Sequence, residues 1–150
     1  MRMDTENIVL SGNIGRTEAP LILAVEDDLD NQLLLRYALE MFGWRYLIAA
    51  DAMAAFALAK KRSPSLILLD IVLPQISGIH IASMLKSHQQ TQNIPLIAVT
   101  GLTKDRDKEL ILASGFNDYI SKPFVLEALQ QAIANNLRQI PYCEIACPLF

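Results

Sequence analysis

Five short strand-like segments, most of them apolar, alternate with segments of helical patterning and constrain what this chain can fold into. We expect strands at 21–25 (LILAV), 44–49 (WRYLIA), 65–69 (SLILL), 95–99 (PLIAV) and 117–121 (NDYIS). Continuous apolar runs of this length are typical of strands that are buried on both faces. Strands that alternate with helices indicate a parallel sheet. Because crossovers are right-handed, we predict an α/β fold with a doubly wound five-stranded parallel sheet and five helices.

Helix boundaries are marked by capping residues and breakers. Asp28 and Asp51 are expected to cap the first two helices, and Gly43 is the expected stop of the first. In that first helix, the apolar side chains that stack at i+4 spacing are Leu29, Leu33, Tyr37 and Met41. The last helix carries Leu126, Leu129, Ile133 and Leu137 on one face.

The chain length favours a single domain with two short tails. It has 150 residues, 52% of them hydrophobic, which is enough to build a packed core. Residues 1–18 show no sustained periodicity and are expected to form a flexible arm. We assign residues 19–139 to the domain and 140–150 to a C-terminal tail.

Charge and cysteine usage exclude several classes of function. The net charge is −3 and no basic run exceeds Lys60-Lys61-Arg62, so we expect no direct binding to nucleic acid. No apolar run approaches the roughly 18 residues of a membrane span, and no signal peptide is evident. The two cysteines, Cys143 and Cys147, are too few and too local for a disulfide framework. We therefore expect a cytoplasmic protein that does not contact the membrane.

Acidic residues follow two of the predicted strands. Ligands of open α/β sheets bind outside the carboxyl ends of the strands, where the strand order reverses. With the order 2-1-3-4-5, Glu26 and Asp27 would face Asp70 across that point. Carboxylates this close repel one another unless a cation neutralises them, and Mg²⁺ is a hard cation that prefers such ligands. The sequence therefore predicts a magnesium site at this rim.

Two further residues at the same rim suit phosphoryl transfer. Thr100 ends the fourth strand and offers a hydroxyl, while Lys122 follows the fifth and offers a compact positive charge. No serine, cysteine or histidine stands at these strand ends, so Asp70 is the natural covalent acceptor. Each residue also has a simpler interpretation, as a helix cap, a turn residue or a helix entry; their convergence on one rim favours the functional one.

Four segments resemble the signatures of bacterial response regulator receiver domains of two-component systems. These segments are LILAVEDD, ILLDIVLPQISG, AVTG and YISKPF, and the resemblance covers about residues 20–138. It implies a flavodoxin-like, CheY-like fold with strand order 2-1-3-4-5. It also implies phosphorelay signalling through an aspartyl phosphate.

The same resemblance implies roles for individual residues. Asp70 corresponds to the phospho-acceptor, Asp27 to a direct Mg²⁺ ligand, and Glu26 to a second acid that acts mainly through water. The main-chain carbonyl of Val72 would complete the protein ligands of the metal.

Three other residues match switch and phosphate-contact positions of the family. Thr100 resembles the switch hydroxyl, and Tyr119 the aromatic residue that swings inward on activation. Lys122 resembles the lysine that contacts the phosphoryl group, and the peptide bond before Pro123 is often cis in the family.

Two departures from the family pattern bear on the site. Glu26 is longer than the aspartate that many relatives carry, which affects metal affinity. Val72 and Leu102 are apolar at positions where relatives often orient a water molecule that hydrolyses the acyl phosphate. We therefore predict a comparatively persistent phosphorylated state.

The expected function is that of a stand-alone receiver. Asp70 would accept a phosphoryl group from a histidine kinase or a histidine phosphotransfer protein, and the domain would signal to a downstream protein by contact. The face built by the fourth helix, fifth strand and fifth helix is a frequent partner surface in the family, which leaves a homodimer open. The alternatives are a degenerate receiver that serves only as a scaffold, and an aspartyl-nucleophile phosphatase. Such phosphatases need a second aspartate where this chain has Val72.

Overall fold

A single parallel sheet organises the part of the chain that the structure describes. This computed structural model describes residues 19–73, 76–101 and 105–137. The strands are β1 (Leu21–Val25), β2 (Arg45–Ala49), β3 (Leu66–Asp70), β4 (Leu96–Thr100) and β5 (Asp118–Ser121). They lie in the order β2-β1-β3-β4-β5, and every neighbouring pair is parallel. The predicted doubly wound sheet and its strand order are confirmed.

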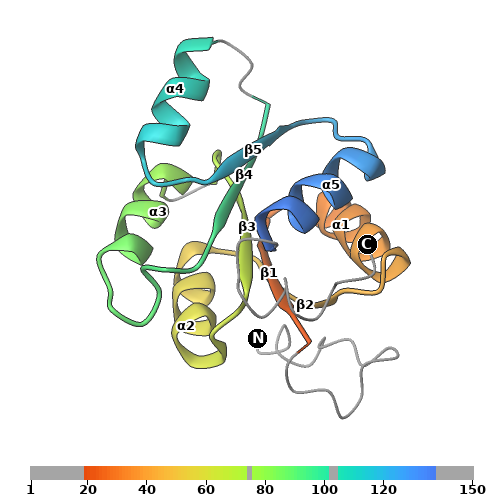
Figure 1. Cartoon of the computed structure of the whole chain (residues 1–150), viewed down its shortest axis with the longest axis horizontal. Helices are drawn as coiled ribbons and strands as arrows, with labels where there is room; N and C mark the ends of the chain where they lie inside the picture. The colour runs from red at the N-terminus through yellow and green to blue at the C-terminus, as the bar shows by residue number, and fades with distance from the viewer. Residues whose placement is uncertain (1–18, 74–75, 102–104, 138–150) are drawn as a thin grey trace.

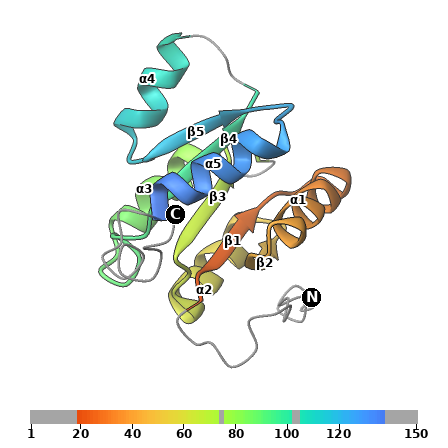
Figure 2. The ribbon, with the colours of Figure 1, turned by 45° about the vertical axis from the view of Figure 1, so that its right-hand side comes forward.

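Helices cover both faces of this sheet. They are α1 (Leu29–Met41), α2 (Ala52–Arg62), α3 (Gly78–Lys86), α4 (Asp105–Ala113) and α5 (Leu126–Leu137). Helices α1 and α5 lie on one face, α2 and α3 on the other, and α4 lies beside β5 at the sheet edge (Figure 1). The view in Figure 2 shows the same two layers of helices around the sheet. None of these described helices is both long and apolar enough to cross a membrane.

The alternation of side chains along each strand produces two separate cores. In β1, Leu21, Leu23 and Val25 join the core under α2 and α3. Ile22 and Ala24 of the same strand join the core under α1 and α5. Continuous apolar runs are needed because both faces of every central strand are buried.

Polar caps set the helix starts that the sequence predicts. The Asp28 side chain accepts a hydrogen bond from Asn31 N at 2.9 Å, and Asp51 accepts one from Ala54 N at 2.8 Å. Both aspartates therefore act as N-caps. Gly43 follows α1 with φ of 81°, a conformation that few residues other than glycine adopt readily. A third cap, Ser77 on α3, was not predicted.

The stacked apolar side chains of α1 do not face the core. Buried positions on α1 are Leu35, Ala38 and Leu39. The i+4 series lies on the opposite side and is exposed: Leu29 (73%), Leu33 (63%), Tyr37 (60%) and Met41 (47%). The spacing predicted the helix correctly, but it did not identify the buried face. On α5 the corresponding expectation is confirmed, since Leu129, Ile133 and Leu137 are buried.

Gly78, the first residue of α3, packs directly against the end of β3. Its amide donates to Ile71 O at 2.8 Å. A Cβ atom at this position would lie 2.3 Å from Asp70 O and 2.8 Å from Ile71 Cα. Only glycine lets α3 start this close to the residue that carries the central carboxylate.

We expect Gly78→Ala to lower the free energy of unfolding by about 1–3 kcal/mol, because the added methyl group collides with backbone rather than with a movable side chain. Urea denaturation measures the change. Gly101→Ala is the matched control, since no described atom beyond its chain neighbours lies within 4 Å of its added Cβ; it should change stability by less than about 0.5 kcal/mol. Equal effects of the two substitutions would contradict the close approach at Gly78.

Candidate functional site

Three acidic side chains converge where β1 and β3 end. Glu26 and Asp27 follow β1 directly, and Asp70 is the last residue of β3. One carboxylate oxygen from each lies within 4.8 Å of the others. Glu26 and Asp70 are 2% and 5% exposed, whereas Asp27 is exposed. The predicted cluster therefore forms, with two members buried and one open to solvent.

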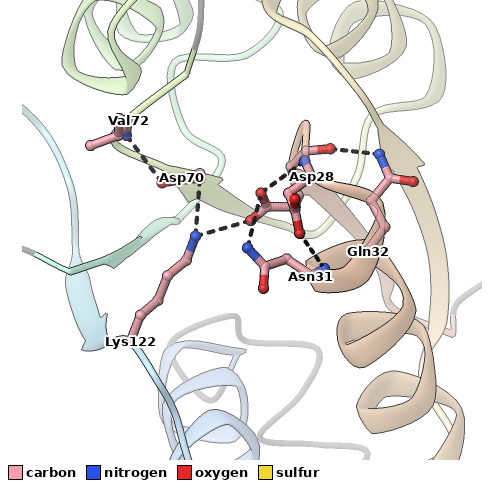
Figure 3. A network of polar contacts seen from close by, with 7 residues as sticks. Asp28, Asn31, Gln32, Asp70, Val72 and Lys122 are labelled. Atoms are coloured by element: carbon pink, nitrogen blue, oxygen red, sulfur yellow. Dashed lines mark hydrogen bonds and ion pairs between the residues drawn. The ribbon is translucent and has the colours of Figure 1, made fainter.

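The first turn of α1 holds Glu26 in place. The Glu26 carboxylate accepts a hydrogen bond from Asp28 N at 3.2 Å and a long one from Asn31 Nδ2 at 3.5 Å. Gln32 Nε2 donates to the Glu26 main-chain carbonyl at 2.7 Å (Figure 3). Sequence reasoning missed Asn31 and Gln32. Their position one turn into the helix after the acids is the signal that could have found them.

Asp70 is bound through both of its carboxylate oxygens. Oδ1 accepts a hydrogen bond from Val72 N at 3.0 Å, and Oδ2 lies 3.0 Å from Lys122 Nζ (Figure 3). The backbone of Val72 thus lies beside the Asp70 carboxylate. Its side chain is 66% exposed and adds no polar group.

Lys122 bridges the two buried acids. Its Nζ lies 3.0 Å from Asp70 Oδ2 and 3.1 Å from Glu26 Oε1. The Lys122 amide donates to Thr100 O at 2.8 Å, which ties the start of the loop to the end of β4. The following Lys122–Pro123 peptide bond is cis, as the resemblance implied.

Burial and charge act in opposite directions on these groups. Burial raises the pKa of Glu26, and the nearby Asp70 carboxylate adds to that rise; hydrogen bonds from Asp28 N and Lys122 offset part of it. Burial alone would lower the pKa of Lys122, but its hydrogen bond and charge interaction with Asp70, and then those with Glu26, raise it. Lys122 therefore remains charged while it holds the two acids.

The remaining predicted residues lie on β4 and β5. Thr100 is fully buried at the end of β4. Tyr119 is half-buried on β5, with Lys108 Nζ 5.6 Å from its ring centroid. Leu102 lies outside the described residues, as do Cys143 and Cys147.

A pocket of about 230 Å³ opens beside Lys122, between α1 and the segment that follows β5. Its lining is mostly apolar and includes Leu34, Leu35, Val99 and Phe124. Glu26 and Lys122 also line it, so the pocket adjoins the acidic cluster.

This donor set suits a hard divalent cation. Mg²⁺ binds through one or two carboxylates and keeps several waters or phosphate oxygens. Asp27 is exposed, and none of the hydrogen bonds described above uses its carboxylate, so this side chain can bind a metal without breaking any of them. Lys122 then balances part of the negative charge that two buried acids retain. The residues present therefore fit the metal that the sequence predicts.

Comparison with known proteins agrees with this geometry. The family described as response regulator receiver domain matches residues 22–134, and the chain belongs to that family. Members of this family are phosphorylation-controlled signalling domains.

Two relatives and two solved structures give the scale of the similarity. The polar-differentiation response regulator DivK of Brucella ovis is 34% identical over 116 residues, which cover 77% of this chain and 94% of DivK. An uncharacterised 14.6 kDa protein of Leptolyngbya boryana is 34% identical over 102 residues, which cover 68% of this chain and 78% of that protein.

Among structures, the receiver domain of a sensor histidine kinase from Pseudomonas aeruginosa is 30% identical, with a TM-score of 0.74 over 79% of this chain and 98% of that domain. That crystal structure has a magnesium ion coordinated in its active-site cleft. A response regulator from Chloroflexus aurantiacus has a TM-score of 0.76 at 27% identity, over 80% of this chain and 98% of that one.

We expect Glu26→Gln to raise the free energy of unfolding without divalent metal by on the order of 1 kcal/mol at neutral pH. Glutamine brings no charge into the buried site, although its single amide oxygen can accept from only one of Asp28 N and Lys122 Nζ, which bind different oxygens of Glu26. Because the folded-state pKa of Glu26 is raised above its ordinary value of 4.5, its contribution to stability is fully present below 4.5 and is lost as pH rises through the folded pKa. The advantage of glutamine should therefore vanish in acid and grow toward neutral pH.

Urea denaturation in EDTA across this pH range measures the difference between the two proteins. Asp27→Asn, which changes an exposed acid of the same cluster, is the matched control and should alter stability less. A neutral-pH loss of stability in Glu26→Gln would show that the ion pair with Lys122 outweighs the cost of burying the carboxylate.

Proposed function

We propose that Asp70 accepts a phosphoryl group from a phosphohistidine on a partner histidine kinase or histidine phosphotransfer protein. The phosphorylated domain then presents an altered surface to a downstream protein. One observation carries the proposal: the buried Asp70 carboxylate lies 3.0 Å from a fixed ammonium group and within 4.8 Å of two further carboxylates. That combination of an acceptor oxygen, a cation and metal ligands suits phosphoryl transfer.

The transfer exchanges one bond to phosphorus for another. An oxygen of Asp70 attacks the phosphorus atom, and an O–P bond forms as the N–P bond of phosphohistidine breaks. The imidazole of the partner leaves with the electron pair of that bond. Lys122 already contacts Asp70 Oδ2, so its charge is in place for the phosphoryl oxygens.

The residues that would hold Mg²⁺ are Asp27, Asp70 and the main-chain carbonyl of Val72, with Glu26 as a second acid that would act mainly through water. Bound Mg²⁺ supplies charge neutralisation at the phosphoryl oxygens. The magnesium ion in the cleft of the Pseudomonas aeruginosa receiver domain supports this assignment. Asp27 is the exposed acid of the cluster, which favours it as a direct ligand.

The change of surface starts from Thr100 and Tyr119. Thr100 stands at the carboxyl end of β4, next to the strand that carries Asp70, and this position supports a role in which its hydroxyl contacts the phosphoryl group. Tyr119 of β5 pairs with Ala98 of β4, the strand that carries Thr100. Movement of Thr100 toward the phosphoryl group would give Tyr119 room to turn inward.

The first test is intact-mass spectrometry after incubation with acetyl phosphate, with and without Mg²⁺. Wild type is expected to gain one phosphoryl group only with Mg²⁺, and Asp70→Asn is expected to gain none, because its amide cannot form the acyl phosphate. Asp51→Asn is the matched control. It makes the same chemical change at a helix cap where asparagine works equally well, so phosphorylation should persist.

The absence of an adduct on folded wild-type protein would favour the scaffold alternative. Steady release of inorganic phosphate from many turnovers, without dependence on a partner, would favour the phosphatase alternative.

Val72→Asn is expected to shorten the lifetime of the phosphorylated protein by about tenfold, equivalent to about 1.4 kcal/mol of barrier. The exposed valine offers no polar group to a water near Asp70, whereas an amide can orient one. The decay of the phosphorylated mass after removal of the donor gives the rate. Met53→Asn, an equally exposed apolar position on α2, should leave the lifetime unchanged. A rapid decay in wild type that Val72→Asn does not alter would overturn the prediction of persistence.

A further inference from the structure

The outer face of α1 carries an apolar ridge that no described residue covers. The ridge consists of Leu29, Leu33, Tyr37 and Met41, which are between 47% and 73% exposed. Leu34, 41% exposed, flanks it on the side of the pocket beside Lys122. Large apolar side chains that line up along a whole helix are unusual on a free surface and mark an interaction site.

This ridge does nothing for the core or for the acidic site. The packing of α1 on the sheet uses Leu35, Ala38 and Leu39 instead. Helix formation does not require apolar side chains at these positions, because charged residues such as glutamate or lysine would stabilise an exposed helix surface equally well. We therefore expect another polypeptide segment to cover the ridge.

The chain itself contains a segment of matching chemistry. Residues 138–150 read RQIPYCEIACPLF and include two charged residues, Arg138 and Glu144. Their large apolar side chains are Ile140, Tyr142, Ile145, Leu149 and Phe150. Residues 1–18 match less well, because five of those 18 residues are charged.

This segment continues from a helix on the correct face of the molecule. It follows Leu137, the last residue of α5, and α5 covers the same face of the sheet as α1 (Figures 1 and 2). Trp44, just beyond the end of α1, donates from Nε1 to Gln130 Oε1 of α5 at 2.7 Å. Helix α5 is thereby tied to the C-terminal end of α1.

The segment is also long enough. Thirteen residues span up to about 40 Å when extended, at roughly 3.3 Å per residue. Helix α1 has 13 residues and is about 20 Å long. A chain that leaves α5 can therefore reach the ridge and follow it.

We propose that residues 140–150 pack along the apolar ridge of α1 in the same molecule. The contact buries both apolar surfaces and sets the tail beside the pocket at Lys122. A protein that reaches the acidic cluster across α1 would displace the tail. The proposal concerns a contact within the chain, and its test uses no phosphodonor, so its outcome is independent of the proposed function.

Thiol trapping in the full chain tests the contact. Cys143→Ser leaves Cys147 as the single native thiol. Leu33→Cys then places a thiol on the ridge, and Met53→Cys places an equally exposed one on α2 at the opposite face of the sheet. With dilute protein and a mild oxidant, peptide mapping should show an intrachain disulfide to Cys147 that forms roughly tenfold faster from the ridge than from α2, because contact raises the effective concentration.

Two further variants separate contact from chance collision. Tyr37→Cys should behave as Leu33→Cys does, so the result does not depend on losing one leucine. Ile145→Asp in the Leu33→Cys protein should reduce trapping to the rate seen on α2. Equal rates on the two faces would overturn the proposal. Interchain disulfides that increase with protein concentration would also overturn it, in favour of the tail of a second copy.

Discussion

The positive charge of Lys122 is the feature on which the rim of this sheet depends. Two carboxylates, Glu26 and Asp70, are buried there within reach of each other, and such a pair is unfavourable unless a cation lies between them. The ammonium group contacts both, at 3.1 and 3.0 Å. It comes from beyond the sheet's edge strand, so the arrangement closes only when β5 is in place. The site and the last strand of the fold therefore stabilise each other.

The strand order explains how three distant segments meet at one point. Because β1 and β3 are neighbours, the acids that follow or end them share one edge. Lys122 reaches that edge from β5 across β4, where its amide is bound to Thr100 O. Gly78 lets α3 start against Asp70 without a collision. Each contact depends on parallel strands that end together, which is why ligand sites of such sheets lie at their carboxyl ends.

The sequence predicted the strands and the charged residues at their carboxyl ends, but it did not predict which face of α1 is buried. Strand ends are marked by an abrupt change from apolar to charged residues, so Glu26, Asp70 and Lys122 could be found without coordinates. The face of a helix is marked only by periodicity, and α1 has two candidate faces. The more regular series is exposed, while the buried face includes the small Ala38. The sequence did not predict the roles of Asn31 and Gln32, because no spacing rule specifies that side chains at these positions donate to Glu26.

The exposed ridge lies on the helix whose first turn holds Glu26, and this gives the ridge a physical connection to the acidic cluster. Helix α1 is capped by Asp28, and its first turn supplies hydrogen bonds from Asn31 and Gln32 to Glu26. Leu29, the first ridge residue, therefore lies in the same turn that positions a predicted metal ligand. Leu34 connects the ridge to the pocket at Lys122. A segment that packs along the whole ridge would therefore contact the turn that holds Glu26 beside Lys122.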